Sequence, residues 1–233
     1  ITDAVHASGG RIFLQIWHGG RACHPLLNGG AQPVAPSPIA ITNNDVRTPE
    51  GKKPYVIPRE LRDDELPGII AGFKKAAENA QVAGFDGIEI HGANGYLLDE
   101  FLRDGANKRT GSYGGSFENR ARLMLEVLEA VGSVWGSERV GLRISPRNGY
   151  NSMTDSDAIG LSIWLASRLN ELNLAYLHVV RGDLLQQQNG DILTPIRQHY
   201  QGILIGNMRY TPDEANQAIA ENKIDAVAFG VSF

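Results

Sequence analysis

The sequence contains only one cysteine, Cys23, among its 233 residues. A single cysteine excludes an internal disulfide and any zinc site built on paired cysteines. An excess of charge is also missing, because 22 Lys and Arg face 26 Asp and Glu, and this balance argues against a strongly basic nucleic-acid binder. No apolar run approaches the roughly 20 residues of a membrane span. No stretch resembles a secretory leader or a twin-arginine signal, so we expect a cytoplasmic protein.

What is present is the composition of a folded chain. Hydrophobic residues make up 42% of the sequence and 27 positions are glycine, which argues against disorder. Short apolar runs alternate with amphipathic stretches, and the runs are apolar enough to be parallel strands covered by helices. Strands are expected at residues 11–17, 87–91, 140–145, 176–180, 202–206 and 226–230. Helices are expected at residues 2–5, 64–83, 117–135 and 156–172, and from 211 onward.

Repeated strand–helix units form either an open doubly wound sheet or a (β/α)8 barrel. No G-x-G-x-x-G turn follows any expected strand, whereas polar residues follow several of them, as the active-site residues of a barrel do. We therefore predict an α/β fold, a (β/α)8 TIM barrel with about six of its eight units in this chain. Residues 1–233 form a single, partial domain in this interpretation, and the chain ends suggest part of a larger fold.

Residues 18–60 interrupt the alternation of strands and helices. The segment has no long periodic run and holds seven of the eleven prolines. A loop of this length in a compact domain is usually functional, such as a cap over a site. The alternative is a surface excursion that packs on the barrel mouth, and both interpretations stay open. His18 and Arg21 could accordingly reach a pocket or anchor the loop.

The segment with the most chemistry is residues 84–98, where a buried strand ends in His91. Asn94 and Tyr96 follow within a turn broken by glycines. Histidine and asparagine can offer two hydrogen-bond donors to one oxygen, and a phenol in the same pocket can donate a proton. The structural alternative is that His91 satisfies a backbone carbonyl and Tyr96 is a core aromatic residue.

The run His91-Gly-Ala-Asn94-Gly-Tyr96-Leu-Leu-Asp-Glu-Phe-Leu resembles the signature of the Old Yellow Enzyme family of FMN-dependent ene-reductases. Residues 14–21, 107–120 and 142–146 resemble further motifs of that family, in family order and along essentially the whole chain. Within that family the sequence most resembles the bacterial reductases that act on maleimides, nitrate esters and enones. Within these motifs Arg109, Glu118, Asn119 and Arg120 could equally be structural ion-pairing residues.

The resemblance implies a flavin site. Gln15 would hydrogen-bond the pyrimidine edge of FMN, and Arg143 would lie near its N1–O2 edge. Gly206 and Asn207 would lie at the phosphate, where glycine permits close approach of the backbone, and Gly230 would join them.

The resemblance also implies the reaction. Trp17 would line the substrate pocket, His91 and Asn94 would bind the activating oxygen, and Tyr96 would donate a proton. NADPH, or NADH, would supply the hydride that FMN passes to an enone, maleimide or nitro compound. The implied partners are thus small molecules, with no metal, nucleic acid or membrane, and a homo-oligomer is possible.

Several departures from the family pattern support an alternative. The family's first two strands would precede Ile1, its last helix would follow Phe233, and Val231 stands where the family has arginine. A six-stranded arc has two open edges, which a partner or the missing strands would close. The alternative is therefore a truncated, non-catalytic remnant that binds phenolic ligands but retains little FMN.

Overall fold

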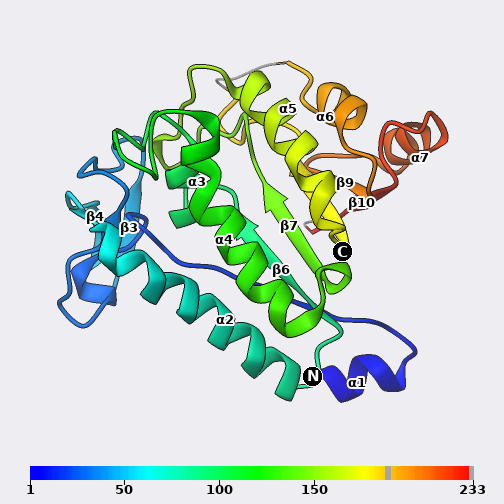
Figure 1. The fold of residues 1–233 in the computed structure, drawn as a ribbon, viewed down its shortest axis with the longest axis horizontal. Helices are drawn as coiled ribbons and strands as arrows, with labels where there is room; N and C mark the ends of the chain where they lie inside the picture. The colour runs from blue at the N-terminus through cyan, green and yellow to red at the C-terminus, as the bar shows by residue number, and fades with distance from the viewer. Residues whose placement is uncertain (187–189, 231–233) are drawn as a thin grey trace.

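The structure is a computed structural model that describes residues 1–186 and 190–230. The run Gln186-Gln187-Gln188-Asn189-Gly190, whose composition predicts a solvated polar turn, lies partly outside these residues, and Val231 lies wholly outside them. Figure 1 shows the helices packed along one face of a twisted sheet, with α1 (Thr2–Ala7) beside the N-terminus.

Six parallel strands form the main sheet, and their order in space follows their order along the chain. A doubly wound sheet would reverse this order at a switch point, so the consecutive order is that of a barrel. All six predicted strands are present, although several are shorter than expected. The strands are β1 (Phe13–Ile16), β6 (Gly87–Gly92), β7 (Val140–Ile144), β8 (Tyr176–Val180), β9 (Leu204–Asn207) and β10 (Ala226–Ala228).

Helices connect successive strands, and α2, α4 and α5 lie along the outer face of the sheet in Figure 1. Two short helices, α3 and α6, were not expected from the sequence. The helices after α1 are α2 (Leu66–Val82), α3 (Leu97–Leu102), α4 (Phe117–Trp135), α5 (Ala158–Leu169), α6 (Leu193–His199) and α7 (Pro212–Ala220). Short 3-10 turns span Pro25–Leu27, Asp63–Glu65, Ser137–Arg139, Tyr150–Ser152 and Asn170–Leu172.

The longest helix, α4, shows how local sequence sets these boundaries. The Ser116 hydroxyl accepts a hydrogen bond from the Asn119 backbone N–H, which caps the first turn. Gly136, at φ 77°, ends the helix in a conformation that other residues rarely adopt. Between these ends the apolar side chains of α4 pack on the sheet and on α2, and the Trp135 indole N–H donates to the Ala77 carbonyl of α2 at 3.0 Å.

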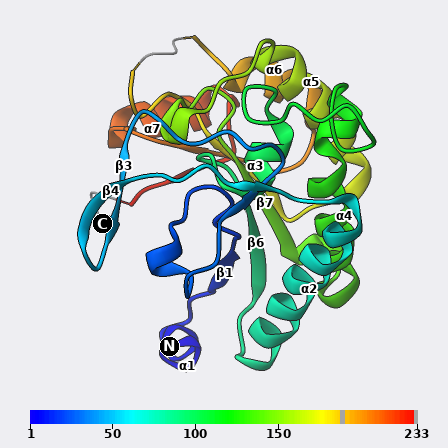
Figure 2. The ribbon, with the colours of Figure 1, turned by 90° about the vertical axis from the view of Figure 1, so that its left-hand side faces the viewer.

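Residues 18–60 form a small substructure at one end of the sheet (Figure 2). An antiparallel hairpin joins β3 (Asp45–Thr48) to β4 (Gly51–Pro54). A short parallel pair joins β2 (Val34–Ala35) to β5 (Arg59–Glu60). In Figure 1 the hairpin and α1 lie at opposite ends of the molecule, and the hairpin is at the end where the strands finish.

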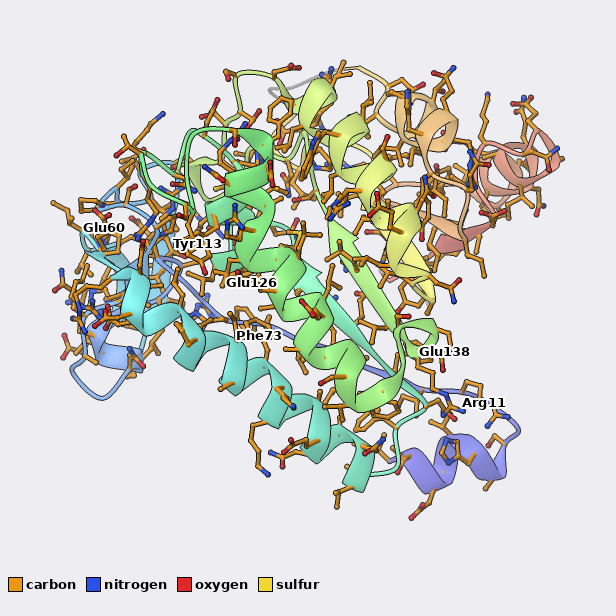
Figure 3. The ribbon with its side chains drawn as sticks, in the orientation of Figure 1. Arg11, Glu60, Phe73, Tyr113, Glu126 and Glu138 are labelled. Carbon is orange, nitrogen blue, oxygen red and sulfur yellow. The ribbon has the colours of Figure 1, made fainter. Side chains whose placement is uncertain are left out.

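Arg109 and Arg120 belong to the fold rather than to a reactive site. Arg109 pairs with Glu60 and Asp63, so it ties the segment after α3 to the residues just before α2. Arg120 forms a buried ion pair with Asp155. Two of the side chains labelled in Figure 3 also join parts of the fold, since the Tyr113 hydroxyl donates to Glu126 of α4 at 3.0 Å.

Within residues 1–186 and 190–230, no helix combines the length and the apolar character needed to cross a bilayer.

Candidate active site

The turn after β6 is fixed by hydrogen bonds at successive backbone amides. Asn94 has φ 57° and Gly95 has φ 71°, so the chain makes a left-handed turn directly after the strand. The Asn94 N–H donates to the Ser145 hydroxyl at 2.7 Å, and the Gly95 N–H donates to Asp99 Oδ2 at 2.8 Å. A Cβ at Gly95 would lie 2.7 Å from the Asn151 Cβ, so only glycine fits there. The turn is therefore rigid before any ligand binds.

This rigid turn places Tyr96 between two rings that the sequence predicted for the same site. The Tyr96 and His91 ring centroids are 5.3 Å apart, and the Tyr96 and Trp17 centroids are 4.5 Å apart with an edge-on geometry. Trp17, which follows β1, is 56% exposed and forms the outer wall of the cluster. Burial raises the pKa of the Tyr96 phenol, so the hydroxyl remains protonated at neutral pH.

His91 is 6% exposed on β6, and its environment keeps the imidazole uncharged. Burial, followed by the nearby Arg143 cation, lowers the pKa of His91 from 6.5 to about 4. The Ala93 backbone lies close to the ring, but neither ring nitrogen makes a well-formed hydrogen bond with any described residue. A neutral imidazole carries one N–H donor. His91 therefore offers a buried donor without a well-formed acceptor among the described residues.

A polar network lies below His91 on the same face of the sheet. Glu89 precedes His91 by two residues, so both side chains point to one side of β6. The Glu89 carboxylate accepts from the Gln15 amide and bonds His178 Nδ1 at 2.9 Å. Sequence reasoning missed Glu89, although a carboxylate inside an otherwise apolar strand was a usable signal. Glu89 holds the amide nitrogen of Gln15, which leaves the Gln15 amide oxygen for another partner.

Arg143 lies beside His91 in the register between β6 and β7. One terminal nitrogen of its guanidinium donates to Asn207 Oδ1 at 2.8 Å, while its buried Nε has no partner among the described residues. Asn207 in turn donates from Nδ2 to the Ala228 carbonyl of β10 at 2.7 Å. Arg143 and Asn207 thus connect β7 with β9 and β10, past β8, which lies between β7 and β9 in the sheet.

The glycines predicted for a phosphate site have different surroundings. Gly206 lies inside β9 and is paired with strands on both sides. A Cβ on Gly206 would lie 2.8 Å from the Tyr210 hydroxyl and 2.9 Å from Ile224, so packing is one reason for this glycine. Gly230 follows β10 at the edge of the described residues, and a Cβ added there would have no described neighbour within 4 Å.

The segment of residues 18–60 is fastened to the loops of the predicted site. The Arg21 guanidinium is buried and donates to the Ile39 carbonyl at 3.0 Å and to the Asn151 carbonyl at 2.9 Å. His18 accepts the Gly20 N–H through Nδ1, and its carbonyl accepts the Leu97 N–H. Arg21 and His18 therefore anchor this segment at the strand ends, a position that fits both the cap and the surface-excursion interpretation.

A separate cleft opens beside the ends of β8 and β9. It has a volume of about 630 Å³ and is lined by loops after β8 and β9 together with α6 and α7. Its charged groups pair with one another, since Arg181 bonds Glu214 and lies 3.6 Å from the Tyr210 ring centroid, and Lys223 pairs with Glu221. None of the residues predicted for the site lines this cleft, so the chemistry is better sought at His91.

Comparison with known proteins adds independent evidence. The model of the NADH:flavin oxidoreductase / NADH oxidase family matches residues 1–233. A probable flavin mononucleotide-dependent alkene reductase of Leishmania infantum is 44% identical over 235 residues, which cover 99% of this chain and 64% of that protein. The old yellow enzyme of Trypanosoma cruzi has a TM-score of 0.97 and 44% identity, over 100% of this chain and 66% of that one. Morphinone reductase in complex with tetrahydroNAD has a TM-score of 0.91 and 42% identity, over 98% of this chain and 64% of that one.

The chain thus spans slightly less than two thirds of the length of these proteins. The structural matches confirm the predicted fold, a TIM barrel of which this chain forms part. Because the family model covers every residue from 1 to 233, the chain belongs to the NADH:flavin oxidoreductase / NADH oxidase family.

Proposed function

We propose that the protein is an FMN-dependent oxidoreductase that uses NAD(P)H to reduce activated C=C bonds of α,β-unsaturated carbonyl or nitro compounds. The observation that carries this proposal is a neutral His91 that has no well-formed hydrogen bond among the described residues. Its ring lies 5.3 Å from the Tyr96 ring, at the end of the strand that leads into the Asn94 turn. Family membership and the name of the Leishmania relative, an alkene reductase, support the same chemistry.

The residues present suit a flavin. Gln15 has an amide oxygen to spare, and the buried Nε of Arg143 has no partner among the described residues. Both side chains lie on the strand face that carries His91. A planar ring edge with alternating N–H and C=O groups matches an amide next to a guanidinium. We infer that Gln15 and Arg143 hold the flavin ring. Asn207 positions Arg143 through its hydrogen bond, and Gly206 and Gly230 lie toward the phosphate.

When bound, FMN would supply the hydride that it had received from NAD(P)H. The chain's own residues account for the remaining requirements. The N–H groups of His91 and Asn94 bind the activating oxygen of the substrate, and they stabilise the negative charge that develops on it as the double bond is reduced. The Tyr96 phenol keeps its proton at neutral pH and can deliver it to the adjacent carbon. Trp17 closes the outer side of the pocket.

The test is to reduce and reoxidise the flavin of the purified protein without oxygen and to monitor both steps in the visible spectrum. We expect a bound flavin that bleaches with NADPH or NADH and recovers with cyclohexenone. The variant Tyr96→Phe should bleach at the same rate but recover about 10²- to 10⁴-fold more slowly, because only the proton donor is lost. A protein that takes up no FMN would contradict the proposal and support the remnant alternative.

A further inference from the structure

The amide of Asn94 can face a ligand with its nitrogen or with its oxygen. The nitrogen would select a ligand atom that accepts a hydrogen bond, and the oxygen one that donates. We propose that Asn148 is a positioning residue that fixes this orientation, so that Asn94 presents only N–H donors to the substrate oxygen. The inference rests on the proposed function for the identity of the ligand. The orientation itself follows from contacts within the chain.

The orientation of Asn148 is set by the backbone around it. Its side chain is fully buried in the loop after β7. Its Oδ1 accepts two backbone N–H groups, from Tyr150 and from Leu184, each at 3.2 Å. Its own carbonyl accepts from the buried Arg103 guanidinium at 2.6 Å, which holds the backbone in place. Because both backbone donors need an oxygen, the Nδ2 of Asn148 must be on the other side.

That Nδ2 donates to Asn94 Oδ1 at 2.8 Å. The Asn94 carbonyl is also occupied, since it accepts from Asn151 Nδ2 at 2.9 Å. Both oxygens of Asn94 are therefore used inside the protein, while no described residue accepts from its Nδ2. A flipped Asn94 amide would direct its NH2 at the NH2 of Asn148. The buried Asn148 NH2 would then lose its acceptor at this part-buried contact, which disfavours the flip.

The consequence is a site that favours ligand atoms that accept hydrogen bonds. With His91 neutral and Asn94 held by Asn148, both residues meet the ligand as donors, and an oxygen gaining negative charge is bound best. Sequence reasoning did not find Asn148, because nothing in the run after β7 marks this side chain as the partner of a turn 54 residues earlier.

The sharpest variant is Asn148→Asp. A carboxylate still accepts the Tyr150 and Leu184 N–H groups, so the loop keeps its contacts, but it can no longer donate to Asn94. We expect Asn94 to flip and turn its oxygen toward the ligand. The control is Asn43→Asp, which adds the same charge nearby, because the Asn43 amide bonds Gly149 and Ser152 of the same loop without contacting Asn94.

The probe is 4-fluorophenol, whose ¹⁹F shift reports whether it binds as phenol or phenolate, titrated into the FMN-loaded protein at about pH 8. The wild-type protein should bind the phenolate, and Asn148→Asp should weaken binding by about 10- to 100-fold and favour the neutral phenol, as expected for the loss of one charge-assisted hydrogen bond. The control should change binding by less than about threefold. In an Asn94→Ala background, Asn148→Asp should have almost no further effect, because the two residues act as one unit.

Equal binding by the wild type and Asn148→Asp, or an equal loss in the Asn43→Asp control, would overturn the inference. So would a full effect of Asn148→Asp in the Asn94→Ala background. The ¹⁵N signal of the Asn94 side chain provides a readout independent of turnover. It should respond to 4-fluorophenol in the wild type, and an unresponsive signal also overturns the inference. Failure of cyclohexenone to reoxidise the wild-type flavin contradicts the proposed function alone.

Discussion

His91 should remain neutral far below the pH at which an ordinary histidine becomes charged. Burial and the Arg143 cation lower the pKa of its imidazole from 6.5 to about 4. In the unfolded chain the same group takes up a proton near pH 6.5, so between these two values the unfolded state binds more protons. Stability from this group is therefore complete above about pH 6.5 and is lost as the pH falls toward about 4.

The size of the effect follows from the two pKa values. Lowering the pH from about 7.5 to about 5 should remove about 2 kcal/mol of folding free energy through His91 alone. Asp99 acts in the opposite direction, because burial raises the pKa of its carboxyl from 3.8 to about 6. The folded state then gains a proton that the unfolded state does not bind in that window, and stability rises as the pH falls through it. A pH–stability curve of the wild type alone therefore mixes the two groups.

The assay must isolate His91, so we compare the wild type with His91→Gln by urea unfolding at several pH values. Asp99 and all other groups act in both proteins and largely cancel. The wild type should lose about 2 kcal/mol more than the variant between about pH 7.5 and about pH 5. Long-range ¹H–¹⁵N spectra should show the His91 ring titrating near 4 rather than 6.5. A parallel pH dependence of the two proteins, or a ring that titrates at its ordinary pKa, would refute the reasoning.

Further predictions concern the fold and the flavin. Asp155→Ala, which strands a buried arginine, should cost about 3–5 kcal/mol in urea unfolding, whereas Glu171→Ala in an exposed ion pair should cost less than about 1 kcal/mol. Gly95→Ala should abolish cyclohexenone-driven reoxidation and destabilise the protein, because a side chain there is crowded. Gly115→Ala, at a similar φ but with no described atom near its Cβ, should cost about 1 kcal/mol of folding free energy and leave turnover intact. Equal effects of the two variants would contradict the crowding argument. Arg143→Lys should weaken FMN binding about 10- to 100-fold in a fluorescence titration, and unchanged affinity would remove Arg143 from the flavin site.

Much of this site could be predicted because parallel strands bring their carboxyl ends to one edge. His91, Arg143 and Asn207 each lie at or near the end of a buried apolar run. The structure places His91 and Arg143 side by side on β6 and β7, and Asn207 reaches Arg143 from β9. The turn with Asn94 and Tyr96 follows its strand directly, so its position needed no knowledge of distant contacts. Glu89 could have been found by the same rule, since residues two apart in a strand share a face.

Other features depend on contacts that local sequence does not encode. The helices α3 and α6 have 6 and 7 residues, which is too short for a helical period to show. From the sequence, Arg21 could have reached a pocket or anchored a loop. Its hydrogen bonds to the Ile39 and Asn151 carbonyls, which only the structure shows, identify it as an anchor. Gly206 was predicted to admit a phosphate, whereas the structure shows that Tyr210 and Ile224 also exclude a side chain there.

The site leaves one of its buried polar groups unsatisfied. Asn148, Asp99 and Glu89 are hydrogen-bonded within the chain, yet His91 has no well-formed hydrogen bond among the described residues. A buried polar group without a partner costs about 1–3 kcal/mol, and it persists only where the surrounding structure fixes its position. The Asn94 turn meets that condition, since its backbone N–H, its carbonyl and its side-chain oxygen are all bonded. A substrate oxygen that accepts from His91 and Asn94 would recover this lost free energy, so the destabilisation of the free site becomes part of the binding energy.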